Sequence, residues 1–305
     1  MIRHILRRLL TIPLTLLLVA FVAFIVLRVT GDPVEIFLDI NATEEQRQIL
    51  TARLHLDDPL LVQFALFIRD VLHGDFGTSL QFGTAAMPVV FERLGATIQL
   101  VSVALTLAFV LGVGAGIVAA IWKDGLADFT LSGLAVAGQS MPSFWLGILL
   151  IQFFALHLHW LPTSGTGGLE HLVLPAVTLA TFLLPNFILI TRAAVLETVN
   201  ELYVTTARAK GASEAIVVLR HVLPNAINPV LSFLGLQMGR LMGGSIITEA
   251  IFAWPGVGSL IIKSIFQRDV PIVLAAIFVM SIAIVLANLL VDLLQSAVDP
   301  RIRLD

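Results

Sequence analysis

Cysteine is absent from this 305-residue sequence, which excludes disulfide bonds, thiolate nucleophiles and cysteine metal sites. The Gly-x-Ser-x-Gly and His-Glu-x-x-His patterns are missing as well. A phosphate-binding loop needs Gly-Lys followed by Ser or Thr, and the only Lys in front of Ser or Thr is Lys263, which follows Ile262. The sequence therefore predicts a chain that is not an enzyme and has no nucleotide site of its own.

Charged residues are scarce, at 13% of the chain, whereas hydrophobic residues make up 58%. Soluble domains carry about a quarter charged residues, so this composition predicts an integral membrane protein. A helix of about 20 apolar residues crosses a bilayer core of about 30 Å. Six largely uncharged runs of this kind occur, at residues 9–27, 97–121, 129–156, 172–191, 226–248 and 270–291.

The first run follows Arg3, Arg7 and Arg8, as the apolar region of a signal peptide would. A signal peptide, however, has only about 7 to 15 apolar residues, followed by a small-x-small cleavage site. The run here is longer and no such site follows it, which favours a first helix that is retained.

Lys and Arg are kept preferentially in the cytoplasmic loops of membrane proteins, and their distribution predicts the orientation. With the N-terminus inside, ten of them fall on the inner side, while the two short outer loops carry only Lys263 and Arg268. The long outer segment is discounted because long segments cross largely regardless of charge. Both termini are therefore predicted to be cytoplasmic. The ten inner residues are Arg3, Arg7, Arg8, Lys123, Arg192, Arg208, Lys210, Arg220, Arg301 and Arg303.

The segment 31–95 is too long for a plain connection, and we expect it to form a small helical insertion on the outer side. Thr43 with Gln46 forms a capping box, and Pro59 begins a second helix that Gly74 can end. Ten acidic residues against four basic ones make the insertion acidic. The acidity fits either a basic surface on a partner or an ordinary solvated face.

Glycines four residues apart indicate where helices approach each other closely. One such stripe is Gly112 with Gly116, and another is Gly235, Gly239 and Gly243. We expect both to serve helix packing.

The run 172–191 contains Pro175 and Pro185, which predict a bent span. A bend leaves backbone carbonyl groups that need burial in protein or a wet cavity. Such a span is one way to build a path for solute.

The stretch 201–225, ELYVTTARAKGASEAIVVLRHVLPN, is a polar and basic island between two apolar runs. Its first part is rich in helix formers, and Gly211 can end that helix in a left-handed conformation. Ser213 can cap a second helix, with Glu214 in its first turn, and this helix should end before Pro224. The island is therefore predicted to be a helix, a tight turn and a second helix at the cytoplasmic surface.

YVTTARAKGAS followed by RHVLPNAINP resembles the EAA loop of binding-protein-dependent ABC importer permeases, specifically of the subclass that carries peptides, nickel and glutathione. In that family the short helix of the loop is the coupling helix, which docks in a groove of the ATPase subunit. Thr205, Thr206 and His221 depart from the general Glu-Ala-Ala pattern, so no contact of the missing Glu is carried over. The alternative is an ordinary amphipathic cytoplasmic loop.

The resemblance implies that this loop is the docking and coupling site for the ATPase. The residues predicted to form it are Tyr203, Thr206, Ala207, Arg208, Ala209, Lys210, Gly211, Ala212, Ser213, Glu214, Arg220, Leu223 and Pro224.

Further stretches extend the resemblance over nearly the whole chain. They are GDFGTS at 74–79, MPSFWLG at 141–147, WLPTSG at 160–165, EAIFAWPGVG at 249–258 and DPRIR at 299–303. In the family, the first outer loop lies under the substrate-binding protein.

Arg240 stands alone as a charged residue inside an apolar run, where Arg is costly and normally faces a polar interior or a partner. It lies about 18 Å along the helix from Asn228, past the midpoint towards the outside. We predict that Arg240, with Gln237, lines the translocation path and attracts a carboxylate such as a peptide C-terminus. The alternatives are a structural ion pair and a contact with a partner subunit.

His157, His159 and His171 fall near one outer loop. His157 and His159 are two residues apart, a spacing that converges on a metal only in a strand or loop, and the neighbouring Trp160 indicates an interfacial belt. No metal site is predicted.

The predicted fold is an all-α integral membrane protein with six transmembrane helices. The resemblance implies the type I ABC importer permease fold, with a small helical periplasmic insertion after the first span. The predicted divisions are the N-terminal tail and first helix at 1–30, the insertion at 31–95, and a five-helix core at 96–305 with the coupling loop at 192–228.

The resemblance implies a permease in the bacterial inner membrane that forms half of the pathway for di- and oligopeptides, with nickel or glutathione as alternative solutes. The implied partners are a homologous second permease, two ABC ATPase subunits that bind ATP and Mg²⁺, and a periplasmic or lipid-anchored substrate-binding protein. Membrane lipid surrounds such a chain, no nucleic acid is involved, and no cofactor binds to the chain itself. A stand-alone secondary transporter is the alternative from another class, but the internal repeats that it predicts are not found.

Overall fold

The computed structural model describes residues 12–25, 45, 48, 51 and 57–298, with side chains as far as residue 290. The regular elements of this described part are helices, and its one β contact is an isolated bridge between Thr78 and Ala85. The all-helical class predicted from the sequence is confirmed. The chain divides into two compact units: residues 1–95 with 256–285, and residues 96–255 with 286–305.

Three helices in the described residues are long and apolar enough to cross a membrane, and two bent pairs of helices bring the number to five. The three are α5 (Ala86–Ile121), the continuous helix Glu214–Ile251 and α14 (Val270–Val298). The bent pairs are α6 (Leu126–Gln139) with α7 and η1 (Ser143–Leu150 and Ile151–His157), and α8 (Glu170–Ala180) with α9 (Leu184–Val199). The sixth predicted run, 9–27, extends beyond the described helix Ile12–Ile25, so the count of six stays a prediction.

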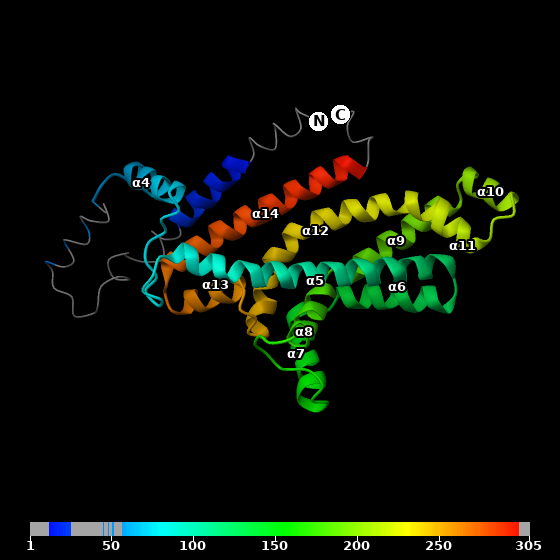
Figure 1. Ribbon diagram of the computed structural model, residues 1–305, viewed down its shortest axis with the longest axis horizontal. Helices are drawn as coiled ribbons and strands as arrows, with labels where there is room; N and C mark the ends of the chain where they lie inside the picture. The colour runs from blue at the N-terminus through cyan, green and yellow to red at the C-terminus, as the bar shows by residue number, and fades with distance from the viewer. Residues whose placement is uncertain (1–11, 26–44, 46–47, 49–50, 52–56, 299–305) are drawn as a thin grey trace. The chain divides into compact units, whose positions relative to one another are not determined.

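The run 129–156 is not the single uninterrupted span that its apolar composition predicts. Its helices meet at an angle of 106°, with the break between Gln139 and Ser143 (Figure 1). Pro142 is the residue before α7 and has an extended backbone, with φ −61° and ψ 129°. Because proline has no N–H group and disfavours a helical conformation in the residue before it, it separates the two helices.

The bend predicted in the fourth run is confirmed. α8 and α9 meet at 57° around Thr181, and Pro185 lies in the first turn of α9, where its missing N–H is tolerated. Pro175 lies inside α8, which continues past it. The bend therefore forms at the second proline of the pair.

α9 is the central helix of the second unit, since it packs against both α6 and α12 (Leu223–Ile251). α5 approaches it through the first glycine stripe. A Cβ atom at Gly112 would lie 2.4 Å from Cβ of Phe187, and one at Gly116 would lie 2.6 Å from Cβ of Thr191. The predicted close approach is thus confirmed for this stripe. At Gly243, in the second stripe, a Cβ would meet nothing within 4 Å.

In the first unit, α4 (Leu60–Leu72) begins directly after Pro59 and ends before Gly74, whose φ is +73°, as predicted. The loop that follows is held by Asp269, which is fully buried and accepts hydrogen bonds from the Ser79 hydroxyl and from the Gln81 N–H. Asp269 directly precedes α14 in the sequence. The GDFGTS stretch is thereby fixed to the start of that helix.

One further prediction concerns the first unit. The capping box of Thr43 and Gln46 lies outside the described residues. α13 (Val257–Phe266) is a short apolar helix of the same unit, and its whole N-terminal half is buried.

Candidate functional site

The island between α9 and α12 has the predicted order of helix, turn and helix (Figure 1). α10 (Leu202–Ala209) is followed by Gly211, whose φ of +81° is the left-handed conformation that glycine adopts without steric cost. α11 (Glu214–Ile216) then begins after Ser213. Ser213 has the extended backbone of a capping residue, although its side chain makes no capping hydrogen bond.

A salt bridge closes the turn around Gly211. The Arg208 guanidinium donates through Nε and Nη2 to the two carboxylate oxygens of Glu214, at 2.8 and 3.2 Å. The Glu214 carboxylate raises the pKa of Arg208, and the hydrogen bond from Arg208 lowers the pKa of Glu214, so both groups are charged near neutral pH. The pair spans the turn between α10 and α11, and because both side chains are exposed it contributes little to stability.

The island packs on the ends of the spans through a shared apolar core. Residues of α5, α9, α10, η2 (Val217–Val222) and α12 meet in it. The buried members are Ala120, Ala194, Val195, Val204, Ala207, Val217, Val222 and Ala226. The Tyr203 hydroxyl also accepts a hydrogen bond of 3.0 Å from the Asn225 side chain. The island is therefore in direct contact with the ends of the spans.

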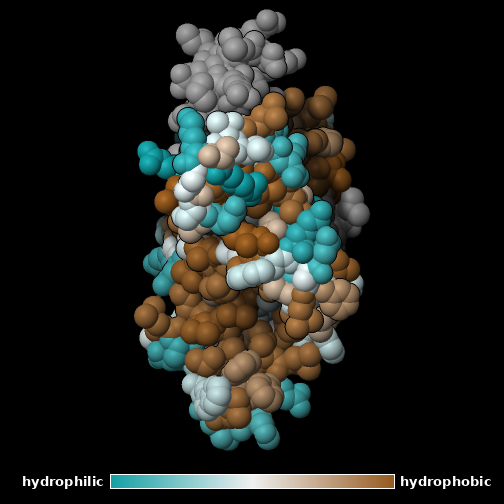
Figure 2. Space-filling model, turned by 90° about the vertical axis from the view of Figure 1, so that its right-hand side faces the viewer, coloured by the Kyte–Doolittle hydropathy of each residue, from teal (hydrophilic) through white to brown (hydrophobic). Residues whose placement is uncertain are grey.

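Most of the predicted docking residues are accessible, as a docking role requires. Ala207 is buried in the shared core, so its part in the site is to hold α10 in place. Ala212 and Leu223 are half-buried. The exposed ones are Tyr203, Thr206, Arg208, Ala209, Lys210, Gly211, Ser213, Glu214, Arg220 and Pro224. Viewed from this end of the molecule, hydrophilic patches lie among broad hydrophobic areas (Figure 2).

The prediction that the second helix ends before Pro224 is wrong. The helix continues through η2, a π-helical turn, into α12, and Pro224 lies in the first turn of α12. In an α-helix the proline ring clashes with the carbonyl group four residues earlier. A π-turn directly ahead of Pro224 changes this spacing and lets the helix pass, so α11, η2 and α12 form one continuous helical rod.

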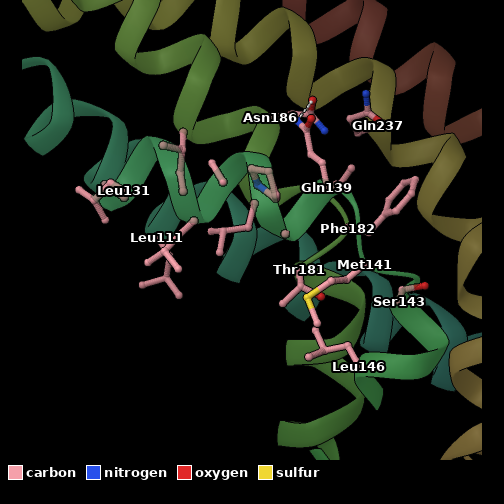
Figure 3. A pocket seen from close by; sticks show the side chains of 18 of the residues that line it. Leu111, Leu131, Gln139, Met141, Ser143, Leu146, Thr181, Phe182, Asn186 and Gln237 are labelled. Atoms are coloured by element: carbon pink, nitrogen blue, oxygen red, sulfur yellow. Dashed lines mark hydrogen bonds between the residues drawn. The ribbon is translucent and has the colours of Figure 1, made fainter. Parts of the chain in front are cut away.

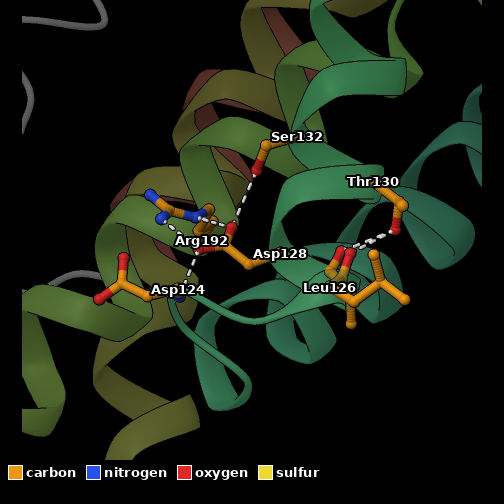
Figure 4. Close-up of polar contacts among 7 residues, drawn as sticks. Asp124, Leu126, Asp128, Thr130, Ser132 and Arg192 are labelled. Carbon is orange, nitrogen blue, oxygen red and sulfur yellow. Dashed lines mark hydrogen bonds and ion pairs between the residues drawn. The ribbon is translucent and has the colours of Figure 1, made fainter.

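An ion pair between α6 and α9 was not foreseen from the sequence. Arg192 donates to Asp128 through Nε at 2.5 Å and Nη2 at 2.6 Å (Figure 4). The Asp128 carboxylate also accepts hydrogen bonds from the Ser132 hydroxyl and the Asp124 N–H. Asp128 immediately precedes the third apolar run, and Arg192 immediately follows the fourth. These opposite charges at the ends of consecutive runs were the available sequence signal for the pair. The contact fixes α6 to α9.

Gln237 and Arg240, the residues predicted to line a path, line one cavity of about 620 Å³ (Figure 3). Both belong to α12. The lining also includes both bends, with Met141 from the first and Thr181 from the second. Arg240 is exposed and makes no ion pair within the described chain.

Gln139 and Asn186 were missed by sequence reasoning. They line the same cavity and point towards each other, and Nε2 of Gln139 donates to Oδ1 of Asn186 at 3.1 Å (Figure 3). Gln139 ends α6 and Asn186 lies in the first turn of α9. Polar residues beside the two bends were the available signal, but nothing in the sequence pairs them.

The family-like stretches of the second unit contact one another. The Gly165 N–H of WLPTSG donates to the carbonyl of Phe252 at 2.9 Å. A Cβ at Gly147 of MPSFWLG would lie 3.3 Å from Cε2 of Phe252. The Trp254 indole donates to the Ala96 carbonyl at 2.9 Å. These stretches thus share a packing role, while the DPRIR stretch lies outside the described residues.

The three histidines have separate surroundings. The ring of His157 stacks on that of Phe153, His159 lies 3.2 Å from the Ala155 carbonyl, and His171 lies 3.4 Å from the Glu170 carboxylate. Among the described residues, no group of three His, Cys, Asp or Glu side chains is placed to hold a metal ion.

Residues 112–304 match the protein family described as the inner membrane component of the binding-protein-dependent transport system, and residues 1–107 match its N-terminal membrane component. The chain belongs to this family. It is 40% identical over 304 residues to the glutathione transport system permease protein GsiC of Salmonella choleraesuis (strain SC-B67), with 99% of each chain covered. The protein of that name from Escherichia coli (strain K12) is 38% identical over the same length. The chain is thus an inner-membrane permease of the peptide, nickel and glutathione subclass of ABC importers, as the sequence predicted.

Solved structures agree with the fold. An inward-facing MetNI methionine ABC transporter gives a TM-score of 0.58 at 20% identity, covering 70% of the permease and 97% of that chain. An amino acid ABC transporter with histidines gives 0.53 at 20% identity, covering 69% and 94%. The permease therefore has the ABC importer permease fold.

Proposed function

We propose that the permease forms one half of the translocation pathway for glutathione and other short peptides. The full-length identity with the glutathione permeases supports this solute class. Glutathione is itself a tripeptide, so glutathione and the di- and oligopeptides expected from the sequence share carboxylate, ammonium and amide groups. Nickel serves as the competing solute in the test.

The observation that carries the coupling half of the proposal is the island built from α10, Gly211 and the rod from Glu214 to Ile251. The element is compact, mostly exposed and salt-bridged, and it shares an apolar core with the spans. It is therefore suited to transmit a movement of a bound partner protein to the spans. We infer that it lies in the cytoplasm and docks on an ATPase subunit. Both termini are then cytoplasmic as well.

Energy is supplied by ATP, with Mg²⁺, bound to two partner ATPase subunits. Closure of the ATPase pair moves the island as a rigid body, and the spans shift between inward-open and outward-open arrangements. A homologous permease completes the pathway, and a periplasmic or lipid-anchored substrate-binding protein delivers solute to the outer face. In this arrangement the insertion between the first and second spans is periplasmic.

The cavity beside the bends is the proposed part of the path in this chain. Gln237 and Arg240 reach it from α12, and residues at both bends line it as well. Bent spans are suited to line a translocation path, because the backbone carbonyl groups that lose their helical hydrogen bonds at a bend need a polar environment.

The test is uptake into proteoliposomes that contain the permease, its partner permease and both ATPase subunits, supplied with the binding protein. We expect ATP-dependent accumulation of labelled glutathione and trialanine and none of Ni²⁺. Accumulation of Ni²⁺ alone would reject the solute class. Uptake by the permease without ATPase subunits would reject the coupling and favour a secondary transporter.

A further inference from the structure

The cavity beside the two bends has the composition of a small-molecule site. Its volume of about 620 Å³ falls within the usual range, and an apolar wall carries a few polar groups. The polar groups come from α6, α7, α9, α12 and the second bend. They are Gln139, Ser143, Thr181, Asn186, Gln237 and Arg240.

Some of these polar groups already have partners within the chain. Gln139 and Asn186 bond to each other, and the Thr181 hydroxyl donates to the Thr178 carbonyl at 2.7 Å. Their role is to hold the wall in shape, because each bond joins or closes a bend.

Gln237 differs from them. Its side chain is only 2% exposed, it lines the cavity, and its Oε1 atom has no hydrogen-bond partner within the described chain. A buried acceptor without a donor is costly, and native structures rarely leave one unsatisfied. The atom is therefore available to an N–H group that enters the cavity.

Arg240 lies three residues further along α12, which places it on the same helix face about 4.5 Å along the axis. It too lines the cavity, and it makes no ion pair within the described chain. A guanidinium group inside a span requires a polar or anionic partner. Its planar set of donors matches a carboxylate in two-point geometry.

We propose that this cavity binds the main chain of a short peptide during transport, an inference that rests on the proposed function. Arg240 binds the C-terminal carboxylate, and Gln237 Oε1 accepts a hydrogen bond from a peptide N–H group. The site recognises the main chain and the free C-terminus that short peptides share. Its apolar wall accommodates different side chains.

The experiment measures binding to the assembled complex of both permeases and both ATPase subunits in nanodiscs, with no substrate-binding protein and no ATP. The probes are tritiated trialanine, trialanine amide and glutathione. We expect saturable binding of trialanine and glutathione, and about 10- to 100-fold weaker binding of the amide, because a charge-assisted contact is lost. This comparison uses the unaltered permease and does not depend on the folding of any variant.

Two variants assign the contacts. Arg240→Gln should weaken trialanine binding to the level of the amide and remove the difference between the two ligands. Gln237→Leu should weaken both ligands by the same factor and keep that difference. Arg268→Gln and Gln152→Leu are matched controls, because both residues are exposed and neither lines the cavity. The controls should bind all three probes like the unaltered complex.

Three results would overturn the proposal: no saturable binding by the unaltered complex, equal binding of trialanine and its amide, or an undiminished difference between them in Arg240→Gln. If the Arg240→Gln complex does not assemble, and the unaltered complex binds trialanine and its amide equally, the role of Arg240 is a contact with the partner permease. A failure of the proposed function can be distinguished from a failure of this site. ATP-driven glutathione uptake by a complex that binds none of the probes rejects only this site, whereas absence of such uptake rejects the function.

Discussion

Arg192 and Asp128 are 64 residues apart and form a two-point ion pair, with Nε–Oδ1 and Nη2–Oδ2 distances of 2.5 and 2.6 Å. The pair joins the start of α6 to the middle of α9, the helix against which α6 and α12 both pack. α9 ends at Val199, directly before the island. The contact therefore joins the two bent spans, since α6 belongs to one and α9 to the other.

Arg192→Gln should lower the thermal stability of the purified complex. The substitution leaves the Asp128 carboxylate, whose side chain is 7% exposed, without its cationic partner. Arg69→Gln is the control, because Arg69 and Asp70 form an exposed pair, and exposed pairs contribute little. Unfolding midpoints measured by intrinsic tryptophan fluorescence should fall for Arg192→Gln and stay nearly constant for Arg69→Gln. Equal midpoints would contradict a structural role for the pair.

Gly116→Ala should destabilise the packing of α5 on α9 by about 1–3 kcal/mol, the usual cost of overpacking. The added Cβ would lie 2.6 Å from Cβ of Thr191 and 2.7 Å from the Ile188 carbonyl oxygen, and a backbone atom cannot move aside cheaply. Gly114→Ala on the same helix is the control, since its Cβ would meet nothing within 4 Å. Denaturant unfolding of the two variants should separate them, and similar stability would show that α5 does not approach α9 this closely.

Gly211→Val should reduce coupling without removing any side-chain contact. Nothing lies within 4 Å of a Cβ placed there, so the whole effect comes from the left-handed φ of +81°, which costs a branched residue roughly 1–2 kcal/mol. Gly211→Asn should retain most of the coupling, because Asn tolerates this conformation. The measurement is the stimulation of ATP hydrolysis by the loaded binding protein. Equal stimulation in both variants would rule out the turn as a coupling element.

Ser79→Ala should destabilise the loop at residues 74–85 by about 1–2 kcal/mol, because the buried Asp269 carboxylate loses one of its donors. Ser140→Ala is the control: Ser140 is exposed and its hydroxyl donates only to the Val136 carbonyl of its own helix. Protection from limited proteolysis between residues 74 and 85 should fall in Ser79→Ala alone. Unchanged protection would mean that Asp269 does not hold the loop.

Local features were predictable from the sequence where one residue type decides the backbone. Gly211 and Gly74 end helices in the left-handed conformation, and Pro185 lies beside the bend between α8 and α9. Gly112 and Gly116 allow the close approach of α9. Each of these follows from a property of the residue itself, so no knowledge of distant parts of the chain was required.

Other features depend on what a residue meets in the folded chain. Pro224 was expected to end a helix, yet the π-turn before it lets the helix continue. The break at Pro142 was hidden in a long apolar run, because hydropathy alone does not distinguish one span from two bent helices. The pairing of Gln139 with Asn186 joins residues 47 positions apart, and a single sequence contains no signal for it.

The central claim is that the island faces the cytosol and receives force from an ATPase subunit. Because the chain has no cysteine, a Lys210→Cys substitution in the exposed turn introduces one unique thiol that can be labelled and cross-linked. Gln267→Cys, which is exposed at the end of α13 and predicted to face outward, is the matched control.

In sealed vesicles of known orientation, we expect the thiol of the Lys210→Cys variant to react only with reagents on the cytoplasmic side. We also expect it to cross-link to the ATPase subunit with a yield that changes when ATP binds. The Gln267→Cys variant should react only from the outside and form no such cross-link. Labelling of the Lys210→Cys variant from the outer side, or full transport activity after removal of the ATPase subunits, would contradict the account.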